Sequence, residues 1–160
     1  MSDGLEGGCE CGDVRYRLIG APIVVNCCHC RDCQRISGSA FAINAMIETD
    51  RVEVICGEAE QSSLEREGAG DTHAWRCGRC LTLLFADHPL FGAAMRFVRV
   101  GTLDEGERLV PQAHFFVRSK HPWVTLPEDV PAFETLPDKG LGVELGAEAR
   151  ARLRAAMGER

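Results

Sequence analysis

The sequence has no long apolar run and no basic leader at its start. Its longest apolar stretches, such as residues 81–86, fall far short of the roughly 20 residues that a membrane helix needs. The first eight residues, MSDGLEGG, contain neither a basic region nor an apolar one. We therefore expect a cytoplasmic protein with no membrane partner. In that reducing compartment, clustered cysteines serve as metal ligands or redox groups more often than as disulfides.

Positive charge is also scarce. The chain has 18 Lys and Arg against 24 Asp and Glu, which gives a net charge of −6. An acidic surface repels phosphate backbones, so a nucleic-acid partner is not expected. Hydrophobic residues make up 45% of the 160 residues and charged residues 26%, which is enough to bury a core. We expect one domain over 1–160, with its core at about 5–137 and a tail at 141–160; the oligomeric state stays open.

Strand-length segments dominate the chain, and none extends into a long helical period. They carry alternating or β-branched residues and are separated by glycine and proline. The pattern predicts a mainly β fold. The expected strands cover 14–18, 22–25, 41–47, 51–55, 81–85, 95–100 and 114–117.

Two segments have helical character. Residues 32–37 could form one or two turns before Gly38. Residues 147–157 are rich in Ala, Arg and Glu, which favour helix. The only large apolar residues of this second segment are Leu153 and Met157, so we expect a loosely docked helix.

Residues 118–140 contain four prolines and several large apolar side chains, among them Trp123 and Phe133. A segment this apolar does not suit a solvated linker. We expect an extended arm that wraps the core.

Seven of the nine cysteines fall into three tight groups. A short spacing lets one turn direct two thiolates at a single ion about 2.3 Å away. Gly12 and Gly78, beside two of these groups, supply the backbone freedom that such turns need. The groups are the pair Cys9 and Cys11, the triplet Cys28, Cys30 and Cys33, and the pair Cys77 and Cys80.

The ligand count suggests how these cysteines divide. A structural zinc takes four ligands, and a catalytic zinc takes three and leaves one position open. The two pairs together make one closed site, here named the four-thiol group, and the triplet makes an open one. A different pairing, a thiolate-bridged binuclear cluster or an iron–sulfur centre would also satisfy the sequence.

The remaining candidates have simpler interpretations. Cys27 and Cys56 lie at the ends of expected strands and are interpreted as small buried hydrophobes. His29 lies between two triplet residues and is expected to face away from the metal. His114 interrupts an apolar strand, which fits a hydrogen-bonded core histidine better than a catalytic one.

The cysteine groups and their flanks resemble the glutathione-dependent formaldehyde-activating enzyme family, which includes centromere protein V. The resemblance spans residues 7 to about 137. The chain departs from the family pattern where Leu81, rather than glycine, follows Cys80. The matching pieces are 7–16, 28–35 with Gly38 and Phe41, 75–80, and 114–117 with Trp123.

This resemblance implies a fold, a metal content and an activity. The fold would be a β-tent, in which small antiparallel sheets surround the metals. Two zinc ions would bind per chain, a structural one at the four-thiol group and a catalytic one at the triplet. The implied reaction adds glutathione to formaldehyde to give S-hydroxymethylglutathione, and its reverse is carbon–sulfur lyase chemistry. Glutathione would be the co-substrate.

An open zinc suits this chemistry, because zinc can hold a thiolate or polarise a carbonyl oxygen. The expected partner is therefore a small thiol or aldehyde. Arg31 and Arg35 lie close to the triplet in sequence and are candidates to bind the carboxylates of glutathione. The alternative function is a non-catalytic zinc-binding module for protein or nucleic acid, although the sequence shows no basic tail.

Overall fold

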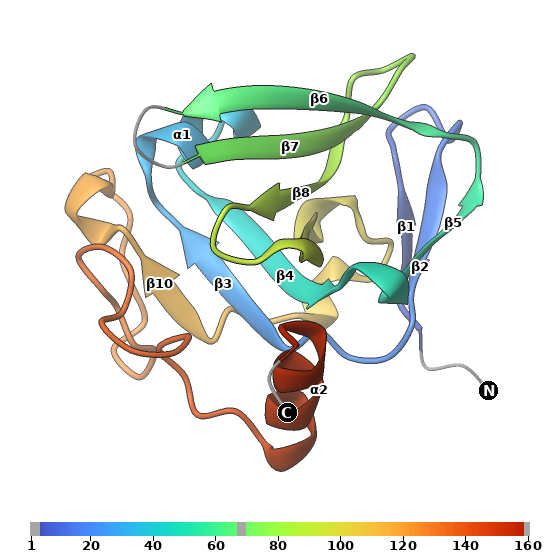
Figure 1. Cartoon of the computed structure of the whole chain (residues 1–160). Coiled ribbons are helices and arrows are strands. Elements are labelled where there is room, and N and C mark those ends of the chain that lie inside the picture. Colours follow the sequence, from blue (N-terminus) through green and yellow to red (C-terminus); the bar gives the residue numbers. More distant parts are fainter. Residues whose placement is uncertain (1–3, 67–69, 159–160) are drawn as a thin grey trace.

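The computed structural model describes residues 4–66 and 70–158, which form two β-sheets with two short helices (Figure 1). The small sheet is antiparallel and has the order β1-β2-β5. Its strands are β1 (Glu6–Gly8), β2 (Arg15–Leu18) and β5 (Val52–Cys56). The prediction of a mainly β protein is therefore confirmed.

The large sheet has seven strands in the order β10-β3-β4-β9-β8-β7-β6. All its neighbours are antiparallel except β10 and β3, which run parallel. In chain order its strands are β3 (Val24–Cys28), β4 (Ala42–Glu48), β6 (Ala59–Arg66), β7 (Gly70–Cys77), β8 (Leu83–His88), β9 (Gly92–Arg99) and β10 (Ala113–Phe115).

The helices are α1 (Arg31–Ser37) and α2 (Ala147–Ala156), close to the two segments expected from the sequence. Gly38 ends α1 with a positive φ of 64°. Short 3-10 turns complete the fold at η1 (Thr49–Arg51), η2 (Val100–Thr102), η3 (Gly106–Arg108) and η4 (Val117–Ser119). The described residues include no helix with the length and hydropathy that crossing a bilayer requires.

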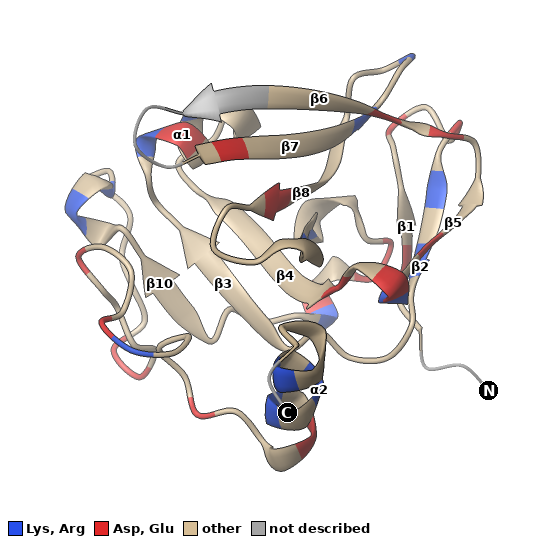
Figure 2. Cartoon of the chain, in the orientation of Figure 1, with Lys and Arg blue, Asp and Glu red and all other residues tan. Residues whose placement is uncertain are grey.

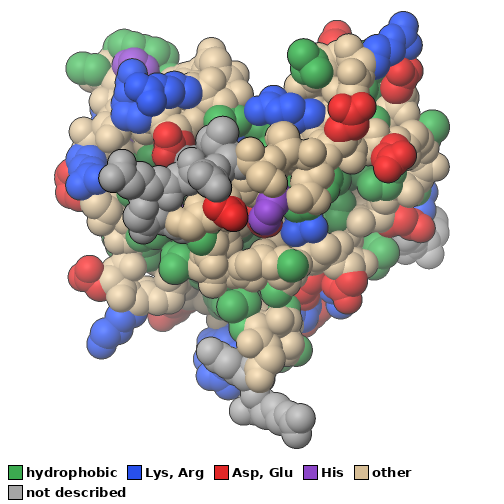
Figure 3. Space-filling view, turned by 45° about the horizontal axis from the view of Figure 1, so that its top comes forward, with side chains coloured by type: hydrophobic (Ala, Val, Ile, Leu, Met, Phe, Trp, Pro, Cys, Tyr) green, Lys and Arg blue, Asp and Glu red, His purple; other side chains and the backbone are tan. Residues whose placement is uncertain are grey.

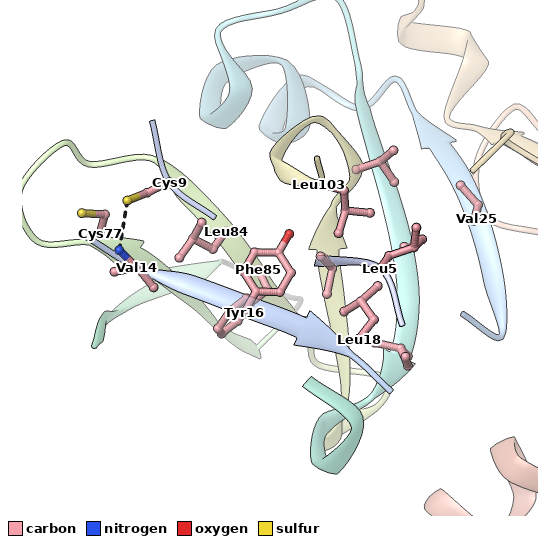
Figure 4. Packing of buried hydrophobic residues seen from close by; sticks show 14 residues of the cluster. Leu5, Cys9, Val14, Tyr16, Leu18, Val25, Cys77, Leu84, Phe85 and Leu103 are labelled. Atoms are coloured by element: carbon pink, nitrogen blue, oxygen red, sulfur yellow. Dashed lines mark hydrogen bonds between the residues drawn. The ribbon is translucent and has the colours of Figure 1, made fainter. Parts of the chain in front are cut away.

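Both sheets contribute to the main hydrophobic core (Figure 4). Tyr16 and Leu18 of β2 are fully buried, as are Leu84 of β8 and Val98 of β9. Burying each large side chain stabilises the fold by about 1.5–3 kcal/mol. The Tyr16 hydroxyl shares a hydrogen bond of 2.7 Å with Thr102 Oγ1, so the one polar atom of this ring is satisfied.

Helix α2 covers a second apolar cluster on the large sheet. Leu153 packs on this cluster, and the Arg152 guanidinium donates to both carboxylate oxygens of Glu48 at 2.6 and 2.7 Å. Arg152 also donates to the carbonyl oxygen of Ala21 at 2.8 Å. The expectation of a loosely docked helix considered only the apolar residues and did not include this ion pair; α2 itself has no fully buried residue.

The extended arm lies against β10, as expected. Phe133 N–H donates to the His114 carbonyl at 2.9 Å, and His114 N–H donates to the Pro131 carbonyl at 2.8 Å. Val117 N–H donates to the Phe133 carbonyl at 3.0 Å. These backbone bonds hold the arm to the edge of the large sheet.

Three features of the strands differ from the expectations. The hairpin of β6 and β7, with eight residues in each strand, was missed because its sequence is polar and shows little apolar alternation. Cys56 is exposed rather than buried, because β5 is an edge strand whose last four residues face solvent. Strand 114–117 ends early, at Phe115, because Phe116 adopts a left-handed φ of 57°.

Charged residues of both signs are dispersed over the fold (Figure 2). On the face drawn in space-filling form, acidic and basic side chains alternate with hydrophobic ones (Figure 3). Neither view shows a broad patch of a single sign.

Candidate functional site

The four-thiol group forms where the turn after β1 meets the turn after β7. Cys9 N–H donates to the Val14 carbonyl at 3.0 Å, which closes the first turn, and Gly12 in that turn has a φ of +80°. Leu81 N–H donates to the Cys77 carbonyl at 2.9 Å, which closes the second. Each turn directs two thiols toward the other turn.

The spacing of these sulfurs suits a tetrahedral ion. Cys9 Sγ lies 3.5 Å from Cys11 Sγ, which lies 3.7 Å from Cys77 Sγ. Four thiolates at about 2.3 Å from one zinc would lie about 3.8 Å apart. The ligand atoms of Cys9, Cys11, Cys77 and Cys80 all lie within 4.8 Å of one another.

Hydrogen bonds favour the thiolate form of two cysteines in this group, Cys80 and Cys9. The hydroxyl and the backbone N–H of Thr82 lower the pKa of the Cys80 thiol to about 5. Cys80 Sγ and Thr82 Oγ1 are 3.1 Å apart. Val14 N–H donates to Cys9 Sγ at 3.3 Å. N–H and O–H donors favour the thiolate form that a metal requires.

Leu81, the residue where the chain departs from the family pattern, has a φ of +63°. Glycine adopts this conformation at little cost, whereas a leucine there is strained. The turn therefore keeps its left-handed residue despite the substitution. Leu81 is 65% exposed, so its side chain gains little from packing.

The triplet forms at the junction of β3 and α1. Cys28 ends β3, Cys30 is the N-cap residue of α1, and Cys33 lies in the first turn of α1. Cys33 N–H donates to Cys30 Sγ at 3.3 Å. The three sulfurs lie within 4.8 Å of one another, and Cys30 and Cys33 are partly exposed.

The triplet thiols differ in acidity. Hydrogen bonds from the thiols of Cys28 and Cys33 lower the pKa of Cys30 to about 2. Cys28 donates in this hydrogen bonding, which raises the pKa of its own thiol. Cys30 is therefore the most acidic thiol of the triplet, and a bound cation would favour ionisation of all three.

Gln34 fixes the loop that carries the triplet. It is buried, and its Nε2 atom donates to the carbonyl oxygens of His29 at 2.8 Å and of Ser119 at 2.9 Å. It thus joins the start of α1 to η4, 85 residues further along the chain. No local pattern in the sequence indicates this role, because the partner carbonyl of Ser119 is distant in the chain.

A third group lies beside the triplet and consists of Cys27, His29 and His114. The nitrogens His29 Nε2 and His114 Nδ1 are 3.0 Å apart, and Cys27 Sγ is 3.6 Å from His29 Nε2. Burial, followed by the charges of His114 and Lys120, lowers the pKa of His29 to about 4. Burial also lowers the pKa of His114.

Burial raises the pKa of the Cys27 thiol to about 12, with a smaller contribution from Cys33. Near neutral pH this third group is therefore an uncharged, hydrogen-bonded network. That agrees with the expectation that Cys27 is a small buried residue and that His29 points away from the triplet.

The arginines chosen from the sequence lie on the surface of α1. Arg31 and Arg35 are both exposed, and Arg31 donates to Gln34 Oε1. Arg79, beside the four-thiol group, pairs with Asp13 at 3.0 Å. Arg99 of β9, which no local pattern in the sequence indicates, lies in register with Asn44 of β4.

Comparisons with known proteins identify a matching family and similar proteins. The family model described as glutathione-dependent formaldehyde-activating enzyme matches residues 4–119. A similar protein from Halomonas elongata is provisionally named a glutathione-dependent formaldehyde-activating enzyme. It is 28% identical to this chain over 158 residues, which cover 93% of this chain and 96% of the relative.

A crystal structure of a Rhodobacter sphaeroides protein aligns with a TM-score of 0.49 and 20% identity, covering 62% of this chain and 88% of that one. The family match includes all seven cysteines of the four-thiol group and the triplet. The chain belongs to the glutathione-dependent formaldehyde-activating enzyme family.

Proposed function

We propose that this protein is a zinc-dependent enzyme of the carbon–sulfur lyase type, acting on the adduct of a thiol such as glutathione with a small aldehyde. The observation that carries the proposal is the separation of its cysteines into one group of four and one of three. Four thiolates complete a zinc coordination shell, whereas three leave a position for substrate.

The donor sets fit zinc. All seven sulfurs are thiols near the right mutual spacing, and thiolate ligands select soft or borderline ions. Cys9, Cys11, Cys77 and Cys80 would hold the structural ion, and Cys28, Cys30 and Cys33 the second ion. When bound, the second ion supplies Lewis acidity and a coordination position for a thiolate.

The proposed reaction forms one carbon–sulfur bond and moves one proton. In the forward direction the thiol sulfur forms a bond to the aldehyde carbon, the carbonyl π bond breaks, and the thiol proton ends on the aldehyde oxygen. The reverse direction cleaves the carbon–sulfur bond. The chain's own residues position the reactants, because Gln34 fixes the triplet loop and the partly exposed Cys30 and Cys33 leave it open on one side.

Thiols add to formaldehyde without a catalyst, so the test must measure the rate above the spontaneous reaction. Adduct formation from glutathione and formaldehyde should be faster with the wild-type protein than with Cys30→Ser. Cys56→Ser is the matched control, because Cys56 is exposed and belongs to no group of candidate ligands among the described residues. The proposal fails if all three proteins leave the spontaneous rate unchanged.

A further inference from the structure

A row of polar side chains crosses the large sheet beside the triplet. Asn26 of β3 pairs in register with Asn44 of β4, which pairs with Arg99 of β9. Residues in register share a face of the sheet. Asn44 Nδ2 donates to Asn26 Oδ1 at 3.3 Å, and Arg99 Nη1 donates to Asn44 Oδ1.

This row lies between an apolar surface and the triplet. On one side, Val24 and Met46 occupy the next row, within the cluster that α2 covers. On the other side, two residues further along β3, Cys28 shares the face of Asn26 because side chains alternate along a strand. Both asparagines are buried, at 3% and 5% exposure, in strands that are mostly apolar.

Arg99 has more donors than its neighbours satisfy. Its Nε atom is buried and has no hydrogen-bond partner. Within residues 4–66 and 70–158, no carboxylate forms an ion pair with its guanidinium. A partly buried guanidinium that no carboxylate of these residues neutralises is a favourable place for the carboxylate of a ligand.

Sheet register places this charge on the face that carries Cys28. Arg99 shares the row of Asn26 and Asn44, and Cys28 follows Asn26 by two residues along β3. The guanidinium therefore lies on the same face of the sheet as the first cysteine of the triplet.

We propose that Arg99, held in place by Asn44 and Asn26, is an anion subsite that binds a carboxylate of the thiol substrate whose sulfur occupies the triplet's open position. This subsite rests on the proposed function. It selects thiols that carry a carboxylate within a few bonds of the sulfur over neutral thiols. A guanidinium suits a carboxylate because its N–H groups match both oxygens.

The test compares two small thiols that differ in charge. Binding of 3-mercaptopropionate and of 2-mercaptoethanol is measured on the Co²⁺-substituted full chain, through the sulfur-to-cobalt charge-transfer band. We expect the wild-type protein to prefer the carboxylate thiol. Arg99→Gln should weaken binding of 3-mercaptopropionate about tenfold to hundredfold, as expected for loss of a charge-assisted hydrogen bond. Binding of 2-mercaptoethanol should change less than about threefold.

Two further variants make the result specific. Arg99→Lys keeps the charge and should retain part of the preference. Arg96→Gln is the matched control, because Arg96 lies on the same strand at an odd separation and faces the opposite side, over the Trp75 ring at 3.9 Å. Arg96→Gln should preserve the preference for the carboxylate thiol.

The outcomes separate the subsite from the function. If neither thiol changes the cobalt spectrum, the proposed function fails and the subsite fails with it. If both thiols bind and Arg99→Gln weakens them equally, or weakens neither, the subsite is wrong and the proposed function stands.

Discussion

Cys11 Sγ lies 3.7 Å from Cys77 Sγ, although 66 residues separate these two cysteines in the sequence. The contact joins the first turn of the small sheet to the end of β7 in the large sheet. A metal at this place would close a long loop, and closing long loops removes much entropy from the unfolded chain. We therefore assign the four-thiol group to stability.

Replacing Cys77 by serine should unfold the protein at a much lower temperature. Cys77 is 1% exposed, so the change also leaves a buried hydroxyl without its metal. We expect the loss of one bound zinc and a fall in Tm of roughly 10 °C or more. Thermal unfolding and metal analysis measure both. Cys56→Ser should change the free energy of unfolding by less than about 0.5 kcal/mol; similar behaviour of the two variants would refute the assignment.

Replacing Leu81 by glycine should stabilise the protein. Leu81 holds a φ of +63° with its side chain 65% exposed, so glycine removes strain and little packing. The expected gain is about 0.5–1 kcal/mol in the free energy of unfolding. Gly12→Ala is the converse control, because Gly12 has a φ of +80° and no atom within 4 Å of an added Cβ. Alanine there should cost about 1 kcal/mol; a stabilising Gly12→Ala would show that φ is not the cause.

Removing the Arg152 side chain should release α2. Arg152→Ala leaves the buried Glu48 with Arg51 alone, whose Nε lies 3.4 Å from Glu48 Oε1, so the cost should stay below the roughly 3 kcal/mol of a fully broken buried pair. Hydrogen exchange of the α2 amides should show the loss directly. The exposed Arg154→Ala is the matched control and should leave the exchange rates unchanged.

The same pair should make stability depend on pH. Burial acts to raise the pKa of Glu48, but the Arg152 hydrogen bond and charge outweigh it, so the pKa lies below the usual 4.5. A lowered folded-state pKa contributes stability that is complete above about 4.5 and is lost as the pH falls through the folded value. Arg152→Ala should flatten this part of the stability profile. An unchanged acid slope in the variant would contradict this account of Glu48.

Mild chelation should distinguish the enzyme from a structural zinc module. The triplet offers three ligands from one loop, whereas the four-thiol group offers four ligands from two separate turns. A chelator should therefore remove one zinc without loss of the β-sheet signal in circular dichroism. Loss of both ions together, or of neither, would favour the module. The Cys30→Ser variant should bind one zinc, the ion at the four-thiol group that the chelator leaves in place.

The sequence predicted the parts of the fold that depend on local spacing. Short cysteine spacings and neighbouring glycines indicated both turns of the four-thiol group. The match of strand-length segments to β2, β4, β5 and β9 followed from alternating or β-branched residues.

The features that the sequence did not reveal depend on long-range partners. The β6–β7 hairpin is polar and is recognisable only through its pairing in register. Arg152 stabilises α2 through a carboxylate 104 residues away. Asn26 and Asn44, polar residues within apolar strands, carried the only local signal of the polar row, whereas Arg99 joins them through sheet register.

The most direct test of the central claim is an anomalous zinc map from crystals of the full chain grown with excess zinc. The account predicts two peaks per chain, one among Cys9, Cys11, Cys77 and Cys80, and one bound by Cys28, Cys30 and Cys33 with three sulfurs at about 2.3 Å. A single peak at the four-thiol group, or a second peak at Cys27, His29 and His114, would contradict it.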